Sequence, residues 1–541
     1  MFPKGPELVA EIDQLSIALP DGADRPYAAD RVSLDLEPGK VLCIVGESGS
    51  GKSMCANALI GLLPEQVRIA GGRILLEGQD LVTADPEVMF GIRGRKVAMI
   101  FQEPMSALNP LMKVSAQIEE VFEAHNLLKP KERKERALRL LTEVGMPDPA
   151  RAAASYPFQL SGGQRQRVMI AMALALEPQV LIADEPTTAL DVTTQAQILD
   201  LIRDLQAKHN MAVMFITHDF GVVAEIADLV VVMQLGKIVE KGTVDDVIGN
   251  PQHPYTRKLI AAIPKLGKGM AEKPDRETVL SVENLSKSYR SGGGLLTRPK
   301  VVKAVRNVSF TLQRGETLGI VGESGSGKTS VGRCLVRLQD PDAGRVLIGG
   351  QDMATLKGAE LRAMRRRVQM IFQDPYNSLN PRQKVGRIIA DGLIAYGETP
   401  KNALARAAEL MEMVGLDSTG AARFPHEFSG GQRQRIGIAR ALALEPEIII
   451  ADEAVSALDV SIQAQVLALL ADLKRELDLS LVFITHDLRI AAQICDRVMV
   501  MQHGEVVEFG TGAEIFGAPR HAYTRSLIEA IPGRHWDAAA A

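Results

Sequence analysis

Apolar residues in this chain gather in short continuous runs rather than in alternating patterns. Runs at 41–45 and 317–321 lead directly into glycine-rich segments, and runs at 180–183 and 448–451 end in an Asp-Glu pair. A strand of a parallel sheet is covered on both faces, so its sequence reads as one continuous apolar run. The pattern therefore predicts buried parallel strands and an α/β fold.

Two longer segments, 130–145 and 400–415, repeat their apolar residues with the period of a helix. Each runs from a proline to a glycine. We predict an amphipathic helix in each segment and interpret its apolar stripe as internal packing.

The glycine-rich segments read GESGSGKS at 46–53 and GESGSGKT at 322–329, and both fit the phosphate-loop pattern G-x-x-x-x-G-K followed by Ser or Thr. A strand that ends in such a loop and opens a helix directs main-chain N–H groups at one anion. The lysine is expected to reach the outer phosphates, and the final hydroxyl to face Mg²⁺. Two nucleotide sites are therefore predicted, built on Gly46, Glu47, Ser48, Gly49, Ser50, Gly51, Lys52 and Ser53, and on Gly322, Glu323, Ser324, Gly325, Ser326, Gly327, Lys328 and Thr329.

The other motifs also recur once, in the same order and at nearly constant spacing from about residue 160 onward. A tandem duplication of one domain explains this better than a short-period repeat array. We expect domains at 1–264 and 279–541, joined by a polar linker at 265–278. A second flexible stretch is expected at 291–299.

Each Asp-Glu pair falls where the end of a parallel strand meets ligands. Asp184 and Asp452 are expected to hold Mg²⁺, and Glu185 and Glu453 to orient an attacking water. The segments LSGGQ at 160–164 and FSGGQ at 428–432 precede these strands. A serine before two glycines at a helix start provides a cap and an exposed helix N-terminus, which is another anion site.

Lys and Arg number 62 against 66 Asp and Glu, which gives a net charge of −4. Without a basic excess, no nucleic-acid partner is expected. The first residues lack the apolar core of a signal peptide, and no apolar stretch approaches the ~18–20 residues that span a bilayer. We expect a cytosolic chain that can dock on a membrane.

The four cysteines, Cys43, Cys55, Cys334 and Cys495, form no C-x-x-C pair. We interpret them as small buried hydrophobic residues in a reducing compartment. No disulfide, zinc site or iron–sulfur cluster is expected.

Together these motifs resemble the ATP-binding-cassette (ABC) ATPases over essentially the whole chain. The family's Q-loop glutamine matches Gln102 and Gln373, its D-loop matches 189–191 and 457–459, and its switch histidine matches His218 and His486. The resemblance implies two tandem P-loop nucleotide-binding domains, each with a RecA-like core and a helical subdomain. It also implies that both histidines contact the γ-phosphate, with ATP and Mg²⁺ as cofactors and metal contacts from Ser53, Gln102, Asp184, Thr329, Gln373 and Asp452.

In this family two cassettes face head to tail, so each nucleotide meets the signature of the opposite cassette. The first site would then be completed by Ser429, Gly431 and Gln432, and the second by Ser161, Gly163 and Gln164. The family also stacks an aromatic residue on adenine. Tyr289 fits that role in the second copy, whereas the first copy has Leu19, with Tyr27 as an open alternative.

Two further segments resemble the dipeptide, oligopeptide and nickel importer ATPases. These are the Q-loop extensions at 102–110 and 373–381, and the His-Pro-Tyr-Thr-Arg and His-Ala-Tyr-Thr-Arg segments at 253–257 and 521–525. In most of that family the two ATPases are separate chains. Here the two are fused in one chain, which is similar to the glutathione and microcin-type peptide importer ATPases. The resemblance implies a peripheral ATPase on the cytoplasmic face of the bacterial inner membrane. It would serve two transmembrane permease subunits and, indirectly, an extracytoplasmic solute-binding protein, in uptake of peptides or a related small solute.

The sequence departs from these relatives in two places. Many carry a cysteine cluster after the His-Pro-Tyr-Thr segment, and this chain has none, so an iron–sulfur cluster is not carried over. Ala454 stands where the first copy has Pro186, which puts the turn after Glu453 in doubt.

Two other classes of protein remain as alternatives. A soluble tandem-cassette translation factor should have a long charged helical linker, and 265–278 is too short. A DNA-repair cassette ATPase should show zinc-ligand cysteines or long coiled coils, which this sequence lacks. The sequence does not identify the transported solute.

Overall fold

The structure is a computed structural model that describes residues 8–188, 190–264, 266, 276–291, 300–374, 378–456 and 458–534. Most of the predicted linker and the stretch 292–299 lie outside these residues. The chain divides into two compact units, one with bounds 1–190, 194–263 and 532–541, and the other with bounds 191–193 and 264–531. Each unit is described by itself.

A mostly parallel sheet forms the centre of the first unit, in the order β10-β9-β3-β8-β7-β6. The predicted apolar runs at 41–45 and 180–183 are strands of this sheet, and every residue of β3, β7 and β8 is buried. Its α/β character is confirmed. The strands are β3 (Val41–Val45), β6 (Val97–Ile100), β7 (Val180–Asp184), β8 (Ala212–Ile216), β9 (Leu229–Gln234) and β10 (Lys237–Thr243).

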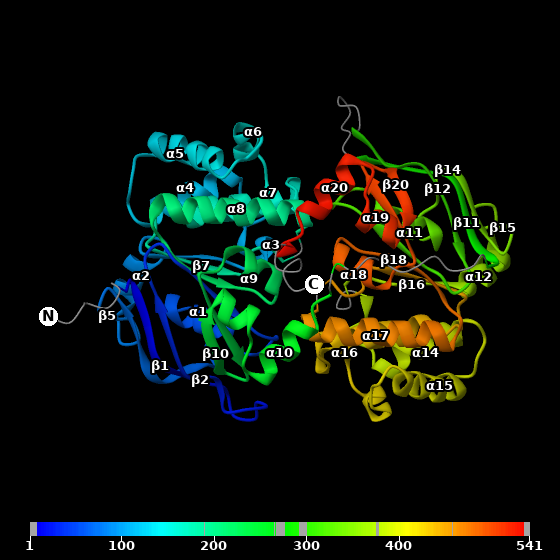
Figure 1. The fold of residues 1–541 in the computed structure, drawn as a ribbon, viewed down its shortest axis with the longest axis horizontal. Helices are drawn as coiled ribbons and strands as arrows, with labels where there is room; N and C mark the ends of the chain where they lie inside the picture. Colours follow the sequence, from blue (N-terminus) through cyan, green and yellow to red (C-terminus); the bar gives the residue numbers. More distant parts are fainter. Residues whose placement is uncertain are drawn as a thin grey trace. The chain divides into compact units, whose positions relative to one another are not determined.

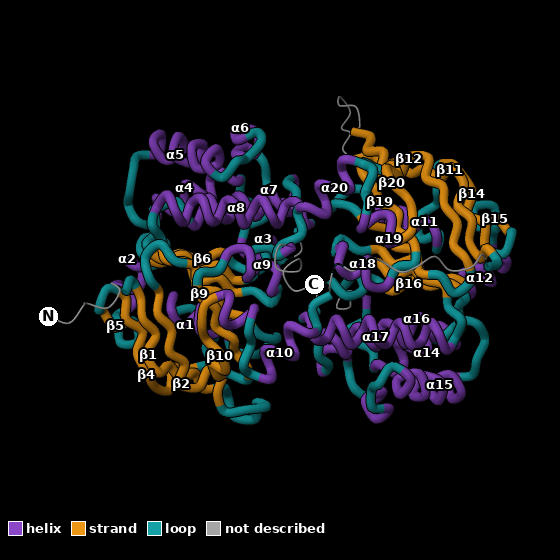
Figure 2. The backbone as a smooth tube through the Cα atoms, in the orientation of Figure 1, coloured by secondary structure: helices purple, strands orange, loops and turns teal. Residues whose placement is uncertain are grey.

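A second, antiparallel sheet completes the core in the order β2-β1-β4-β5, and its inner face packs with β3 and the first helix around residues such as Leu34, Ile44 and Leu59. In Figures 1 and 2 these strands lie at one end of the unit, and helices α4, α5 and α6 gather at the other. The strands are β1 (Ala10–Ala18), β2 (Tyr27–Leu36), β4 (Arg68–Leu76) and β5 (Gln79–Asp80).

Helices connect the strands of the first unit and form its helical end. They are α1 (Lys52–Ile60), α2 (Pro86–Ile92), α3 (Pro104–Ala107), α4 (Val114–Ala124), α5 (Pro130–Glu143), α6 (Pro149–Ala154), η1 (Pro157–Gln159), α7 (Gly162–Ala173), α8 (Val192–His209), α9 (Phe220–Ile226), η2 (Asp245–Gly249) and α10 (Pro254–Ala261).

The second unit repeats this architecture, with a central sheet β16-β17-β18-β13-β19-β20 and an antiparallel sheet β12-β11-β14-β15. Its strands are β11 (Thr278–Ser291), β12 (Lys300–Gln313), β13 (Thr317–Val321), β14 (Ala343–Ile348), β15 (Gln351–Asp352), β16 (Val368–Ile371), β17 (Ile448–Asp452), β18 (Ser480–Ile484), β19 (Arg497–Gln502) and β20 (Glu505–Thr511). Its helices are α11 (Lys328–Leu335), α12 (Gly358–Arg367), α14 (Val385–Ala395), α15 (Pro400–Met413), η3 (Ser418–Ala422), η4 (Pro425–Glu427), α16 (Gly430–Leu442), α17 (Val460–Glu476), α18 (Leu488–Ile494), α19 (Gly512–Gly517) and α20 (Ala522–Glu529).

The two predicted amphipathic helices are confirmed as α5 and α15. Each begins at its proline, which suits the first helical turn because that N–H needs no partner. Each buries an inner stripe, such as Leu140 and Leu141 in α5. The expected glycines follow with φ of +68° at Gly145 and +72° at Gly415, the left-handed conformation that ends helices.

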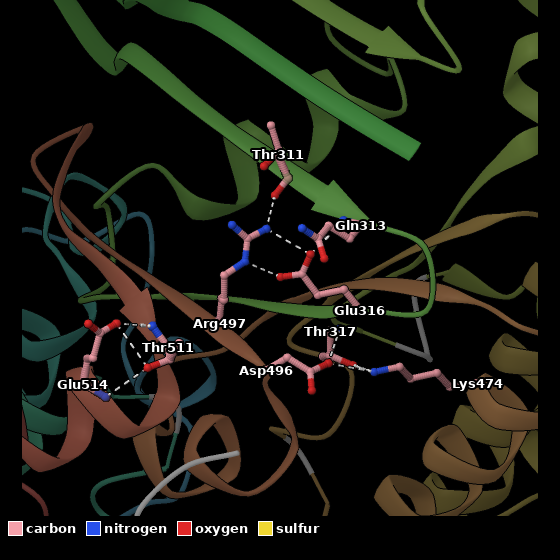
Figure 3. Close-up of polar contacts among 9 residues, drawn as sticks. All are labelled: Thr311, Gln313, Glu316, Thr317, Lys474, Asp496, Arg497, Thr511 and Glu514. Carbon is pink, nitrogen blue, oxygen red and sulfur yellow. Dashed lines mark hydrogen bonds and ion pairs between the residues drawn. The ribbon is translucent and has the colours of Figure 1, made fainter. Parts of the chain in front are cut away.

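Charged side chains anchor the start of β13, the strand that leads into the second phosphate loop (Figure 3). The main-chain N–H of Thr317 donates to Asp496 at 2.8 Å, and Lys474 pairs with the same carboxylate at 3.1 Å. Beside them Arg497 donates to Glu316 at 2.9 Å. These contacts tie β13 to α17 and β19, so the strand that positions the loop is fixed at its base.

Within the part of the chain that the structure describes, no helix is both long and apolar enough to cross a bilayer.

Candidate functional site

Each phosphate loop is held against its own unit by close main-chain packing. Gly46 has φ of +150°, and a Cβ there would lie 2.2 Å from the Met233 carbonyl oxygen. Gly51 has φ of +103° and would meet the Ala28 carbonyl oxygen at 2.2 Å. Since such contacts exclude any side chain, these glycines are what lets the main chain wrap into the loop that α1 follows.

The loop lysines fold back over the loops themselves. Lys52 Nζ donates to the carbonyl oxygens of Gly46 at 2.6 Å and Glu47 at 2.9 Å. Lys328 makes the same two contacts in the second unit, at 2.7 and 2.9 Å. Burial lowers the pKa of Lys328, although Glu453 and Asp452 oppose the shift. Both ammonium groups therefore lie within the loop where a phosphate is expected.

The final loop hydroxyl meets the aspartate at the end of the neighbouring buried strand. Ser53 Oγ donates to Asp184 Oδ1 at 3.0 Å, and Thr329 Oγ1 donates to Asp452 Oδ1 at 3.1 Å. Burial raises the pKa of Asp184 and raises that of Asp452 to about 6. A hydroxyl and a carboxylate side by side form an oxygen-only donor set, which is what Mg²⁺ prefers.

Glu185 follows the strand in an unfavourable backbone conformation, with φ of +48°, and Glu453 has φ of +47°. Residues other than glycine rarely hold this conformation, and where they do the strain often serves a functional site. Gln102 Nε2 donates to Glu185 Oε2 at 2.8 Å, Thr188 Oγ1 donates to the same oxygen at 3.0 Å, and His218 Nδ1 lies 3.3 Å from Oε1.

Those contacts control the charge of Glu185. Burial alone would raise its pKa, but the hydrogen bond and charge of His218, with smaller contributions from Thr188 and Lys52, outweigh it and lower the pKa to about 2. The carboxylate is therefore ionised at neutral pH and able to accept a hydrogen bond from water.

The second unit repeats this arrangement. Gln373 Nε2 donates to Glu453 Oε2 at 2.6 Å, and His486 Nδ1 lies 3.5 Å from Glu453 Oε1. Burial opposes both shifts, yet the pair lowers the pKa of Glu453 and raises that of His486. The structure thus places each Q-loop glutamine on the glutamate that follows the aspartate.

The turn after each glutamate is the same in both units. Thr188 N donates to Glu185 O at 3.2 Å, and Ser456 N donates to Glu453 O at 3.3 Å. Ala454, buried at 2% exposure, therefore leaves intact the turn that the sequence put in doubt. What differs is the hydroxyl, because Ser456 Oγ donates to the main-chain oxygen of Glu453 whereas Thr188 Oγ1 donates to the carboxylate.

Both signature serines cap a helix, as expected. Ser161 Oγ accepts from Gln164 N at 3.3 Å, while Gln164 Oε1 accepts from Ser161 N at 3.1 Å, a capping box at the start of α7. Ser429 and Gln432 repeat it at α16 with 3.3 and 2.9 Å. Gly163 and Gly431 leave no room for a side chain, since a Cβ would lie 2.4 Å from Thr194 Cγ2 and 2.3 Å from Ile462 Cγ2.

The candidate adenine residues differ between the units. Tyr289 is half-buried, and its hydroxyl lies 3.2 Å from Ser330 Oγ and also contacts Gln339. Leu19 packs against the first unit's apolar core, and Tyr27 is 37% exposed. Ala189, Ala457 and residues 375–377, which belong to the predicted D-loops and second Q-loop extension, lie outside the described residues.

Sequence reasoning missed Tyr255 and Tyr523. The segments around them were noticed only as a family resemblance. The Tyr255 hydroxyl lies 3.2 Å from Glu47 N, and the Tyr523 hydroxyl lies 3.1 Å from Glu323 N. No local signal could reveal a contact between residues 208 and 200 positions apart.

Comparison with known families agrees with this geometry. The sequence matches the family model described as ABC transporter over residues 29–188 and again over 305–456. It also matches the model described as the C-terminal region of oligopeptide/dipeptide transporters over residues 239–292 and 507–538. Those two ranges contain both tyrosine segments.

Curated proteins are similar over nearly the full chain. One is the peptidoglycan transport ATP-binding protein YejF of Agrobacterium fabrum (strain C58), 47% identical over 523 residues, with 96% of this chain and 95% of the relative covered. Another is the glutathione import ATP-binding protein GsiA of Escherichia coli (strain K12), 48% identical over 561 residues, with 97% and 89% covered.

Among solved structures, a post-hydrolysis dimer of an ATP-binding cassette bound to ADP and Pi matches 43% of this chain and 98% of its own at 30% identity and a TM-score of 0.39. The two family-model matches and the full-length relatives carry the assignment. The chain belongs to the ABC transporter family and is an ATP-binding subunit with two cassettes fused in one polypeptide.

Proposed function

We propose that this chain is the ATPase of an importer for peptides or a related small solute. The main supporting observation is that each unit brings together a phosphate loop, a hydroxyl–aspartate pair, a glutamate and a histidine at one edge of its own central sheet. One relative is named for peptidoglycan transport and another for glutathione import, and these names support a peptide-like solute.

The donor set supports Mg²⁺ at each phosphate loop. Ser53 and Asp184 would hold the ion in the first unit, and Thr329 and Asp452 in the second, with Gln102 and Gln373 as additional contacts. Bound there, Mg²⁺ would neutralise charge on the outer phosphates of ATP. Burial raises the pKa of Asp452 to about 6, and a bound cation would favour its ionised form.

Phosphoryl transfer depends on positioning and charge stabilisation, so the chain's own groups have limited and separate tasks. Lys52 and Lys328 would leave the loop carbonyl oxygens for the phosphates. Glu185 and Glu453, whose pKa values are lowered, would orient the attacking water and accept its proton. His218 and His486 would contact the γ-phosphate.

We further propose that each ATP-binding site is completed by the signature of the opposite cassette. Ser161, Gly163 and Gln164 would meet the second loop, and Ser429, Gly431 and Gln432 the first. Helix N-termini attract anions, and both signatures open a helix of at least twelve residues. ATP would hold the cassettes together, and hydrolysis would release them.

The region after each Q-loop supplies candidate contacts for the permease subunits. Leu111, just beyond α3, is 85% exposed. In the second unit a pocket of about 430 Å³ beside the Q-loop is lined by Phe372, Ser378, Asn380 and Arg440 among others. We infer that two permease subunits dock on these faces at the cytoplasmic side of the membrane, fed by an extracytoplasmic binding protein.

The test is to identify any permease subunits and solute-binding protein that the neighbouring genes encode, purify the chain together with those permease subunits, reconstitute them in vesicles and add that binding protein. Peptide-loaded binding protein should stimulate ATP hydrolysis. ATPase activity that ignores the binding protein but rises with ribosomes or DNA would favour a soluble tandem-cassette ATPase instead.

A further inference from the structure

In each unit, a tyrosine from the C-terminal segment reaches the phosphate loop. The Tyr255 hydroxyl accepts a hydrogen bond from Glu47 N at 3.2 Å and donates one to Glu47 Oε2 at 3.1 Å. Glu47 is the second residue of the loop. Tyr255 is only 7% exposed. Its hydroxyl therefore contacts both the main chain and the side chain of this one loop residue from inside the protein.

The tyrosine is itself held on the sheet that carries the loop. His253 Nδ1 accepts from Tyr255 N at 3.2 Å and so caps α10. Glu240, on the edge strand β10, accepts from Gln252 N at 2.6 Å and from His253 N at 3.2 Å. The segment is therefore fastened to β10, and β10 pairs through β9 with β3, which ends at the loop.

The second unit repeats every one of these main-chain contacts. Tyr523 OH accepts from Glu323 N at 3.1 Å, and His521 Nδ1 accepts from Tyr523 N at 3.2 Å. Glu508 accepts from Arg520 N at 2.7 Å and His521 N at 3.1 Å. Burial raises the pKa of Tyr523, so its hydroxyl stays protonated at any physiological pH.

The position of this contact gives it a consequence for nucleotide binding. Lys52 holds the carbonyl oxygen of Glu47 only while it is folded over the loop. When the lysine turns to a phosphate, that restraint is lost, whereas the hydroxyl contact to Glu47 N does not depend on the lysine. A tyrosine that served only to fill space would need no hydroxyl at this point, because a phenylalanine ring fills the same volume.

We propose that Tyr255 and Tyr523 are positioning residues that hold the phosphate loop of their own cassette in the shape that receives ATP. The C-terminal segment thereby sets the ATP affinity of its own site. This inference rests on the proposed nucleotide role of the two loops and adds to it a source of control outside the loop.

The test is calorimetric titration of the full chain with MgATP, one site at a time. In a Lys328→Ala background the titration reports the first site, and in a Lys52→Ala background the second. Each phenylalanine change removes the hydrogen bond from the loop main chain, and Tyr255→Phe also removes the one to the Glu47 carboxylate. Each change should therefore weaken binding at least about two- to tenfold. Tyr255→Phe should do this only in the Lys328→Ala background, and Tyr523→Phe only in the Lys52→Ala background.

Matched controls separate positioning from general damage. Lys258 and Glu529 are exposed on α10 and α20, so Lys258→Ala and Glu529→Ala should leave both affinities unchanged. The turnover at saturating ATP should also survive in the tyrosine variants, since the loss lies in binding.

Two results would overturn the proposal: affinities in the Phe variants equal to those of the controls, or an equal loss at both sites from either single change. A wild-type chain that binds no MgATP would refute the proposed function as well. Binding by the wild type with no effect of the Phe changes would refute this inference alone.

Discussion

At the scale of single residues, the two candidate sites share a glutamate with a strained backbone and a lowered pKa. Glu185 and Glu453 are half-buried, each holds a left-handed backbone conformation, and a histidine lowers the pKa of each. Such a residue costs stability and persists only where its surroundings enforce it. The sequence predicted their identity from the Asp-Glu pairs, but it could not predict the strain or the glutamine contact.

The loop lysines should act on one site each. Lys52→Ala removes charge-assisted phosphate contacts at the first site, and Lys328→Ala does so at the second, each costing about 1.5–3 kcal/mol of binding. Nucleotide titration of the full chain should resolve two sites in the wild type and leave one in each variant. A single change that abolished both would contradict independent binding.

The two sites should hold adenine unequally, because Tyr289 can stack on a base and Leu19 cannot. Base–aromatic stacking is worth about 1–3 kcal/mol. Measured ATP affinity should therefore fall at the second site in Tyr289→Ala and rise at the first in Leu19→Tyr.

Tyr27 provides the counter-test, since it is 37% exposed on β2 and could reach a base. Tyr27→Ala should change the first site little. If it weakened that site as much as Tyr289→Ala weakens the second, Tyr27 would be the stacking residue and the asymmetry would be wrong.

At the scale of elements, predictability followed the kind of pattern. The parallel strands were predictable because continuous apolar runs mark strands covered on both faces. Helices α5 and α15 were predictable because each repeats its apolar residues with the helical period over several turns. The antiparallel pairing of β1 with β2 was harder. Its register shifts between Ile12 and Leu15 and again before Ile17, so no regular alternation marks its inner face.

One ion pair at an element boundary should show in the pH dependence of stability. Arg367, at the end of α12, donates to both carboxylate oxygens of Glu447 at 2.8 and 2.9 Å, just before β17. This lowers the pKa of Glu447 in the folded protein. The pair therefore stabilises the fold above the ordinary glutamate pKa, and this contribution disappears as pH falls through the lowered value.

Glu447→Gln should accordingly lower the free energy of unfolding by about 0.5–1 kcal/mol at neutral pH, since the pair is partly exposed. The difference from wild type in urea denaturation should shrink towards acidic pH. Glu476→Gln, an exposed change on α17, should show no such trend. A Glu447→Gln effect independent of pH would contradict an ionic origin.

At the scale of the whole molecule, the chain contains two copies of one cassette, with local differences between them. Motifs contained within a few residues could be predicted from sequence, as could their duplication. Contacts between distant segments could not, and the bond of Tyr255 to the phosphate loop is the clearest case. The pairing of each loop with the opposite signature stays a proposal, because it depends on how two separate units meet.

The central claim is that both glutamates drive ATP hydrolysis in the assembled transporter. The most direct measurement is the ATP turnover of the double variant Glu185→Gln plus Glu453→Gln, reconstituted with its permease subunits, beside the wild type. Removing a positioned base should lower turnover about 10²–10⁴-fold, while MgATP still binds and holds the cassettes closed. A double variant that kept more than about a tenth of wild-type turnover would contradict the account, since general-base catalysis of this size could not then reside in these two residues.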